Sequence, residues 1–141
     1  MNQQTLRFTK FCIVGGSGVI VNLGLLFVLV EYFYLGENLA WLIAILASIL
    51  NNFLWNNAFT YNDRRSNSHN ETMRRIVYYY LISLGVMLFN FAIYKIGISW
   101  GFYYILSAFM GIFFSTFLNF ALINKLVWNN SLTKVQIKNR T

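Results

Sequence analysis

The sequence predicts an all-α integral membrane protein that crosses the bilayer four times. Hydrophobic residues make up 57% of the 141 residues, whereas charged residues make up only 11%. This number of charged side chains is too small to cover the surface of a soluble domain of this length. We therefore expect lipid to surround the protein. Four apolar stretches each exceed the roughly 20 residues that a helix needs to cross about 30 Å of hydrocarbon.

The four stretches define the predicted helices. They are continuously apolar and lack the alternation of membrane-barrel strands, which favours helices. The first stretch is longer than a signal-peptide core, so we expect it to be retained. Very short connections join the first helix to the second and the third to the fourth, which predicts two helical hairpins within a single transmembrane domain, residues 1–141. The predicted spans are 11–34, 39–61, 76–100 and 102–128.

Basic residues predict the orientation of the chain. Ten of the eleven Lys and Arg residues lie before the first span, in the loop at 62–75 or near the end of the chain, and Lys95 alone lies near the other side. By the positive-inside rule, both termini and the loop are cytoplasmic, in a multi-pass protein of the cell membrane. The net charge is +7, and the basic residues lie at the ends of the apolar runs. Anionic phospholipids are therefore the expected partners, and nucleic acid is not.

The two hairpins resemble internal copies. Two spans per copy leave both copies in the same orientation, which predicts parallel repeats. A shift of 67 residues also pairs Asn52 with Asn119 and Asn57 with Asn124, so the register stays open. A shift of 68 residues pairs Arg7 with Arg75, Asn22 with Asn90, Asn51 with Asn119 and Asn56 with Asn124.

Asparagines inside the spans are the candidate functional residues. An amide that enters hydrocarbon without a partner costs roughly 2–7 kcal/mol, so these side chains must face protein or water. Asn22 shares a helix face with Gly15 and Gly18, and Asn119 shares one with Gly111 and Ser115. Such small residues let helices approach closely. Two interpretations stay open: the asparagines bond neighbouring helices, or they line a polar path.

Enzymatic chemistry has little support in the sequence. The four acidic residues show no catalytic spacing within the membrane, and His69 stands alone in the polar loop. No metal motif, catalytic triad or phosphate-binding glycine loop is present. We therefore predict a protein that is not an enzyme and has no catalytic residue, metal site or cofactor.

Three segments resemble the GtrA-like family of small four-span membrane proteins. The first is KFCIVGG at residues 10–16, followed by Asn22, and the second is NFLWNNAFTY at 52–61. The end of the fourth span, with Asn119-Phe120 and residues 124–128, echoes the second. Two positions depart from the family pattern, because Lys10 and Asn57 stand where the family carries arginine.

The resemblance implies a flippase for a monosaccharide linked to polyprenyl (undecaprenyl) phosphate. Such a protein moves its substrate from the cytoplasmic to the outer leaflet, where membrane glycosyltransferases decorate a cell-surface polysaccharide or teichoic acid. A homo-oligomer is expected, because four helices make a thin wall around a sugar phosphate. The alternatives are an anchor or scaffold that recruits a glycosyltransferase, and a small-solute exporter. The expected substrate-binding residues are Asn22, Asn51, Asn56, Asn90, Asn119, Asn124, Lys125 and Lys10.

Overall fold

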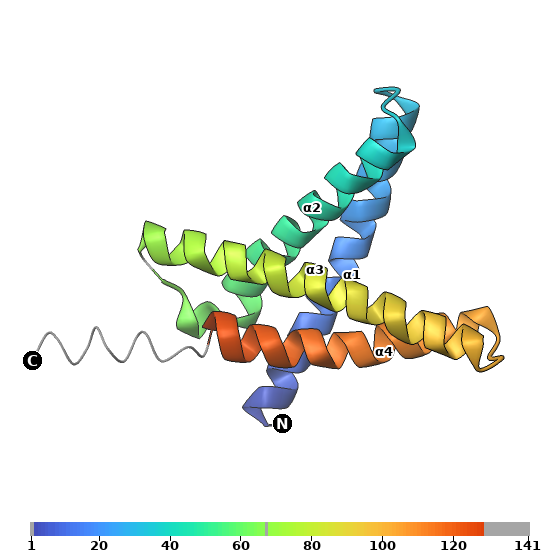
Figure 1. The fold of residues 1–141 in the computed structure, drawn as a ribbon. Coiled ribbons are helices and arrows are strands. Elements are labelled where there is room, and N and C mark those ends of the chain that lie inside the picture. Colours follow the sequence, from blue (N-terminus) through green and yellow to red (C-terminus); the bar gives the residue numbers. More distant parts are fainter. Residues whose placement is uncertain (1, 67, 129–141) are drawn as a thin grey trace, which may run out of the picture. The chain divides into compact units, whose positions relative to one another are not determined.

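The computed structural model describes residues 2–66 and 68–128, and every regular element in those ranges is a helix (Figure 1). The all-α prediction is therefore confirmed. Four helical segments are long and apolar enough to cross a membrane: Gln3–Glu31, Glu37–Thr60, His69–Ser99 and Ile105–Trp128. The elements are α1 (Gln3–Glu31), α2 (Glu37–Trp55), η1 (Asn56–Thr60), η2 (Asn62–Arg64), α3 (His69–Ser99), α4 (Tyr104–Ile123) and η3 (Asn124–Trp128).

Helices α1 and α3 begin earlier than the sequence predicts. The apolar runs start at residues 11 and 76, but the helices start at Gln3 and His69. Hydropathy marks where hydrocarbon begins, whereas a helix continues into the polar interface as long as its backbone bonds are made. The polar first turns of both helices therefore extend beyond the predicted spans.

The chain divides into two compact units, Met1–Thr72 and Met73–Thr141. The first holds the hairpin of α1 and α2, and the second holds that of α4 and most of α3. In each unit, the "turn-side end" is the end with the tight turn, at 32–36 or 100–103. The opposite end is the "loop-side end", which the sequence predicts to be cytoplasmic.

Close approach of α1 and α2 depends on small residues. Ala40 and Ala44 are fully buried, and Gly18 lies directly against the amide of Asn52. Ser48 adds a hydrogen bond across the pair, because its hydroxyl donates to the carbonyl oxygen of Gly18 at 2.8 Å. The core of this unit is therefore a tight helix seam.

In the second hairpin, small residues also allow the two helices to approach closely. A Cβ added to Gly97 would lie 2.6 Å from the Ser107 hydroxyl, and one added to Gly111 would lie 2.6 Å from the Asn90 amide oxygen. The turn contains Gly101 at φ 80°, a conformation that glycine adopts without strain. Glycines thus set the spacing of α3 and α4.

Both second helices end in a π-helix of five residues. The two segments, η1 and η3, begin at Asn56 and Asn124, which are 68 residues apart. This match favours the 68-residue register. In η1 the wider turn is closed by the backbone N–H of Tyr61, which donates to the Asn56 carbonyl at 2.8 Å. Such segments are rare and occur often at functional sites.

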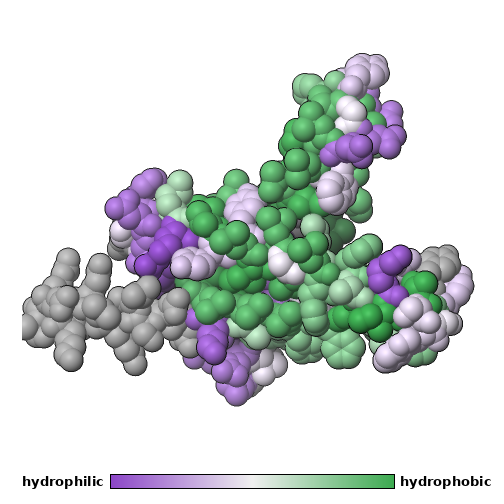
Figure 2. Space-filling model, in the orientation of Figure 1, coloured by the Kyte–Doolittle hydropathy of each residue, from purple (hydrophilic) through white to green (hydrophobic). Residues whose placement is uncertain are grey.

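Large apolar side chains are exposed along the helices. Ile20 is 75% exposed and Leu88 is 68% exposed. Figure 2 shows hydrophobic residues along the helix lengths and hydrophilic residues gathered near helix ends. An apolar outer surface with internally bonded backbone is what the bilayer interior requires.

Candidate functional site

Two of the predicted asparagines join the helices of their own hairpin. The Asn51 side-chain amide donates to the Ser17 hydroxyl at 3.4 Å, which links α2 to α1. The Asn90 amide donates to the Ser115 hydroxyl at 3.3 Å, which links α3 to α4. At these two positions the structure supports the helix-bonding interpretation.

Their repeat equivalents differ. Asn22, equivalent to Asn90, is half-buried on α1. Asn119, equivalent to Asn51, has a buried amide oxygen for which the described part of the chain supplies no hydrogen-bond donor. In each of these two equivalent pairs, one asparagine therefore bonds across its hairpin and the other does not.

Further acceptor oxygens without a donor lie on the second helix of each unit. Among the described residues, no donor reaches the amide oxygens of Asn52 and Asn124 or the hydroxyl of Thr60, although these atoms are buried. Thr60 is 2% exposed, so water does not solvate it from bulk. A buried acceptor without a donor costs about 1–3 kcal/mol. Thr60 and Asn124 lie in the π-helical segments at the loop-side ends, and Asn52 lies one helical turn before η1.

The loop-side end of the first unit is densely packed. Asn56 is 1% exposed, and Tyr61 directly after the span is fully buried. Burial raises the pKa of the Tyr61 hydroxyl, and the positive charges of Arg7 and Arg64 offset part of this effect. The Tyr61 side chain is therefore part of the packing that closes this end of the first unit.

An ion pair that the sequence reasoning missed lies at this end. Arg7 of α1 is buried and donates to the carboxylate of Asp63, whose side chain is 45% exposed. The Arg64 Nε lies 3.8 Å from the same carboxylate oxygen. Asp63 is one of only four acidic residues and directly follows the first hairpin. Because a hairpin returns the chain to the end where it began, the sequence could have predicted a contact between Asp63 and Arg7.

The two candidate lysines differ in their surroundings. The Lys10 ammonium donates to the Phe59 carbonyl at 3.4 Å and lies 4.6 Å from the centre of the Phe59 ring. It therefore stabilises the end of η1. Lys125 is exposed in η3. Asn57, its equivalent in η1, is half-buried and uncharged.

Each unit has polar groups suited to binding at its own loop-side end: the first has Lys10 and the Thr60 hydroxyl, and the second has Lys125 and the Asn124 amide. In the part of the chain that the structure describes, no three His, Cys, Asp or Glu residues are grouped to hold a metal ion.

Residues 10–128 match the model of the GtrA/DPMS transmembrane domain. The chain belongs to this family. The resemblance read from its motifs is thereby confirmed, and with its four candidate spans this GtrA/DPMS domain is a multi-pass membrane protein.

One relative of the GtrA/DPMS domain is a dolichol-phosphate mannosyltransferase of Pyrococcus furiosus. The two are 32% identical over 122 residues, which cover 86% of this chain and 34% of the relative. The chain thus spans about a third of the length of that transferase.

Proposed function

We propose that the chain binds a sugar linked to polyprenyl phosphate and lets its head group cross from the cytoplasmic to the outer leaflet. The observation that carries this proposal is the set of buried acceptor oxygens of Asn52, Thr60, Asn119 and Asn124. Sugar hydroxyls are donors that satisfy such acceptors, whereas lipid chains offer none. Membership of the GtrA/DPMS family and the dolichol-phosphate named in its relative support the same substrate class.

The energetic requirement of the crossing fits this chemistry. A charged group at the bilayer centre costs from about 3 to more than 10 kcal/mol. Polar side chains that replace the water around the head group lower that cost. In this proposal Asn22, Asn119 and Asn124 contact the sugar, while Asn51 and Asn90 hold the hairpins at the spacing that the path needs.

In this proposal each unit contacts the phosphate and the first part of the sugar at its own loop-side end, the first unit through Lys10 and Asn56 and the second through Lys125. Lys10 donates one hydrogen bond to Phe59, and an ammonium group has three donors, so it can also bind phosphate. The membrane potential favours outward movement of the phosphodiester anion by about 2.3 kcal/mol per 100 mV, because the cytoplasm is negative. Glycosyltransferases that consume the sugar in the outer leaflet for polysaccharide or teichoic acid decoration add to this bias.

One observation favours a second candidate function. The match covers only 34% of a relative that is named a transferase, so in that protein the domain accompanies a much longer chain. The corresponding role here is an anchor or scaffold for a separate glycosyltransferase. An anchor does not need hydrogen-bonding side chains inside the spans.

Reconstitution separates the two functions. Vesicles containing the purified protein and a radiolabelled undecaprenyl-phosphate glucose are treated with a membrane-impermeant oxidant of sugar diols. A flippase exposes the inner pool, so the protected label disappears with time, and the Asn119→Leu variant slows this loss. If the protected pool persists as in protein-free vesicles, the flippase proposal is wrong. Co-purification of a glycosyltransferase would then favour the anchor.

A further inference from the structure

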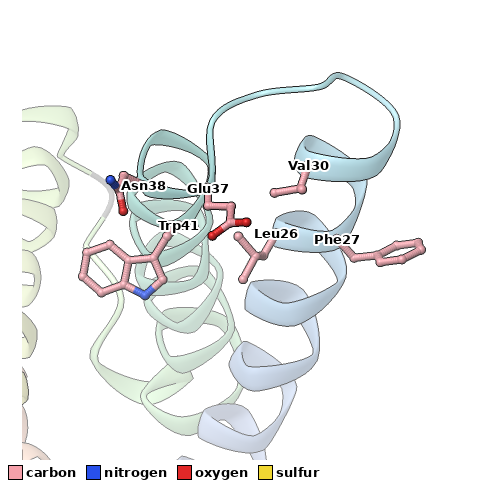
Figure 3. Close-up of a pocket in the computed structure, with 6 residues that line it drawn as sticks. All are labelled: Leu26, Phe27, Val30, Glu37, Asn38 and Trp41. Carbon is pink, nitrogen blue, oxygen red and sulfur yellow. The ribbon is translucent and has the colours of Figure 1, made fainter.

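A shallow groove lies at the turn-side end of the first unit, between the last turns of α1 and the first turns of α2 (Figure 3). Its volume is about 620 Å³. Leu26 and Val30 are four residues apart on α1 and form an apolar wall that faces the start of α2. The groove is therefore an open site with one apolar side, at the end opposite to the ion pair.

The other side of the groove carries polar and aromatic groups from α2. Glu37, Asn38 and Trp41 lie within the first turns, at spacings that place neighbouring side chains together. Figure 3 shows the Glu37 carboxylate directed towards Leu26, with Asn38 and Trp41 on one side of the helix. The indole of Trp41 is accessible, because the residue is 49% exposed. All three residues line the groove, with the carboxylate directed towards α1 and the amide and the indole on the other side of the first turns of α2.

The second hairpin shows that these groups are not needed to build this kind of helix end. A shift of 68 residues places Ile105, Leu106 and Phe109 at the equivalent positions of α4. A negative side chain in the first turn of a helix interacts favourably with the helix macrodipole. This effect explains Glu37, but it does not explain Asn38 or Trp41. The Asn38 amide is replaced by the apolar Leu106 in the second unit, and the Trp41 indole by the smaller ring of Phe109.

We propose that this groove binds the sugar ring of the lipid-linked substrate at the turn-side end. The proposal rests on the function proposed above and adds a second contact to it. The apolar face of a pyranose ring stacks on the Trp41 indole, while Glu37 and Asn38 bond the ring hydroxyls. The negative carboxylate repels the phosphodiester, so the site selects the sugar and leaves the phosphate outside the groove.

Fluorine NMR tests this site without any transport. The protein is labelled with 5-fluorotryptophan in lipid nanodiscs, and each of the four tryptophans is assigned by a Trp→Phe variant. Titration with methyl glycosides of glucose, mannose and N-acetylglucosamine should shift the Trp41 signal saturably, with a dissociation constant of about 1–10 mM for at least one of them. Trp100, which is 72% exposed at the turn-side end of the second unit, should not shift.

Variants and competing probes decide what the groove recognises. Glu37→Leu should weaken glycoside binding at least about tenfold, because the hydrogen bonds to a charged acceptor are lost. Phe109→Leu, at the equivalent of Trp41, should leave binding unchanged. The sugar-site proposal is wrong if no glycoside moves the Trp41 signal, if Trp100 shifts equally, or if tetramethylammonium binds and glycosides do not. The NMR signal does not depend on leaflet transfer. A negative result would therefore exclude the sugar site in the groove, whereas the flippase proposal is tested separately by the vesicle assay.

Discussion

Arg7, near the start of α1, donates a hydrogen bond to Asp63, which lies 56 residues later in η2. The Arg7 side chain is 10% exposed, so the Asp63 carboxylate neutralises a nearly buried guanidinium. Replacing Asp63 by Asn removes that charge and should destabilise the first unit by about 1–3 kcal/mol, less than for a fully buried pair because Asp63 is partly solvated. The thermal melting temperature in detergent should fall accordingly.

A double variant distinguishes the ion pair from a general effect of the loop. Arg7→Gln with Asp63→Asn removes both charges of this pair, so the loss in melting temperature should be smaller than the sum of the losses in the two single variants. Equal melting of Asp63→Asn and the unmodified protein would show that the bond contributes nothing to stability.

Glycine substitutions on α3 should differ sharply by position. A methyl group on Gly97 would meet the Ser107 hydroxyl at 2.6 Å, its Cβ at 2.9 Å and its Cα at 3.3 Å. Backbone must therefore move, and Gly97→Ala should destabilise the hairpin by about 1–3 kcal/mol. Gly85 has no atom within 4 Å of such a methyl group, so Gly85→Ala on the same helix should be neutral or stabilising by up to about 1 kcal/mol.

Thermal melting of both variants in the same detergent tests this pair. Similar melting temperatures for Gly97→Ala and Gly85→Ala would contradict the close approach of α3 and α4 at Ser107.

Leucine substitutions should divide the span asparagines into two classes. Asn51→Leu and Asn90→Leu remove hydrogen bonds between helices, so each should weaken helix association by about 0.6–2 kcal/mol and lower the melting temperature. Asn119→Leu removes a buried amide oxygen that no donor reaches among the described residues, so it should leave the melting temperature unchanged or raise it, but reduce leaflet transfer.

Melting and vesicle transfer are measured on the same preparations of these variants. Full transfer by Asn119→Leu, together with full transfer by Asn22→Leu, would contradict a polar path. Unchanged melting of Asn51→Leu would contradict its packing role.

The membrane fold was predictable because the bilayer imposes its own length scale. A helix must be about 20 apolar residues long to cross, and the sequence contains four such runs, so their number and type follow directly. The starts of α1 and α3 were not predictable from hydropathy, because polar residues from Gln3 and His69 onward extend both helices outside the hydrocarbon.

The hydrogen bonds between helices were predictable in their residue types but not in their pairings. Seams rich in asparagine and small residues could be read from spacing. Which amide faces its own partner helix depends on the rotation of each helix, so the separate roles of Asn51 and Asn119 required coordinates. The helices change from α to π geometry at Asn56 and Asn124. This change in backbone hydrogen bonding could not be predicted from the spacing of apolar side chains.

The predicted topology has a direct chemical test. With Cys12 replaced by Ser, single cysteines at Ser68 and at Asn139, which lies outside the described residues, should both resist a membrane-impermeant thiol reagent in intact cells. Both should react once the cells are permeabilised, which serves as the control. Labelling of either cysteine in intact cells would overturn the assignment of the loop-side end to the cytoplasm.

Lys125 and Asn57 provide the sharpest test of where the phosphate binds. They are the second residues of η3 and η1, so they occupy equivalent places in the two repeats, but only Lys125 is charged. We predict that Lys125→Gln strongly reduces binding of undecaprenyl-phosphate glucose, because a charge-assisted contact with phosphate is lost. Adding Asn57→Arg should restore part of it by placing a cation at the equivalent point.

The competing explanation is that Lys125 only anchors its helix at the interface, where a cation also stabilises the negative end of the helix dipole. Anchoring requires a charge at that place, and an arginine on the other hairpin cannot replace it. Binding is measured with the radiolabelled lipid in nanodiscs, with Lys125→Arg as the control that keeps the charge. Normal binding by Lys125→Gln, or no recovery with Asn57→Arg, would exclude phosphate recognition by this pair and leave Lys125 as an interfacial anchor.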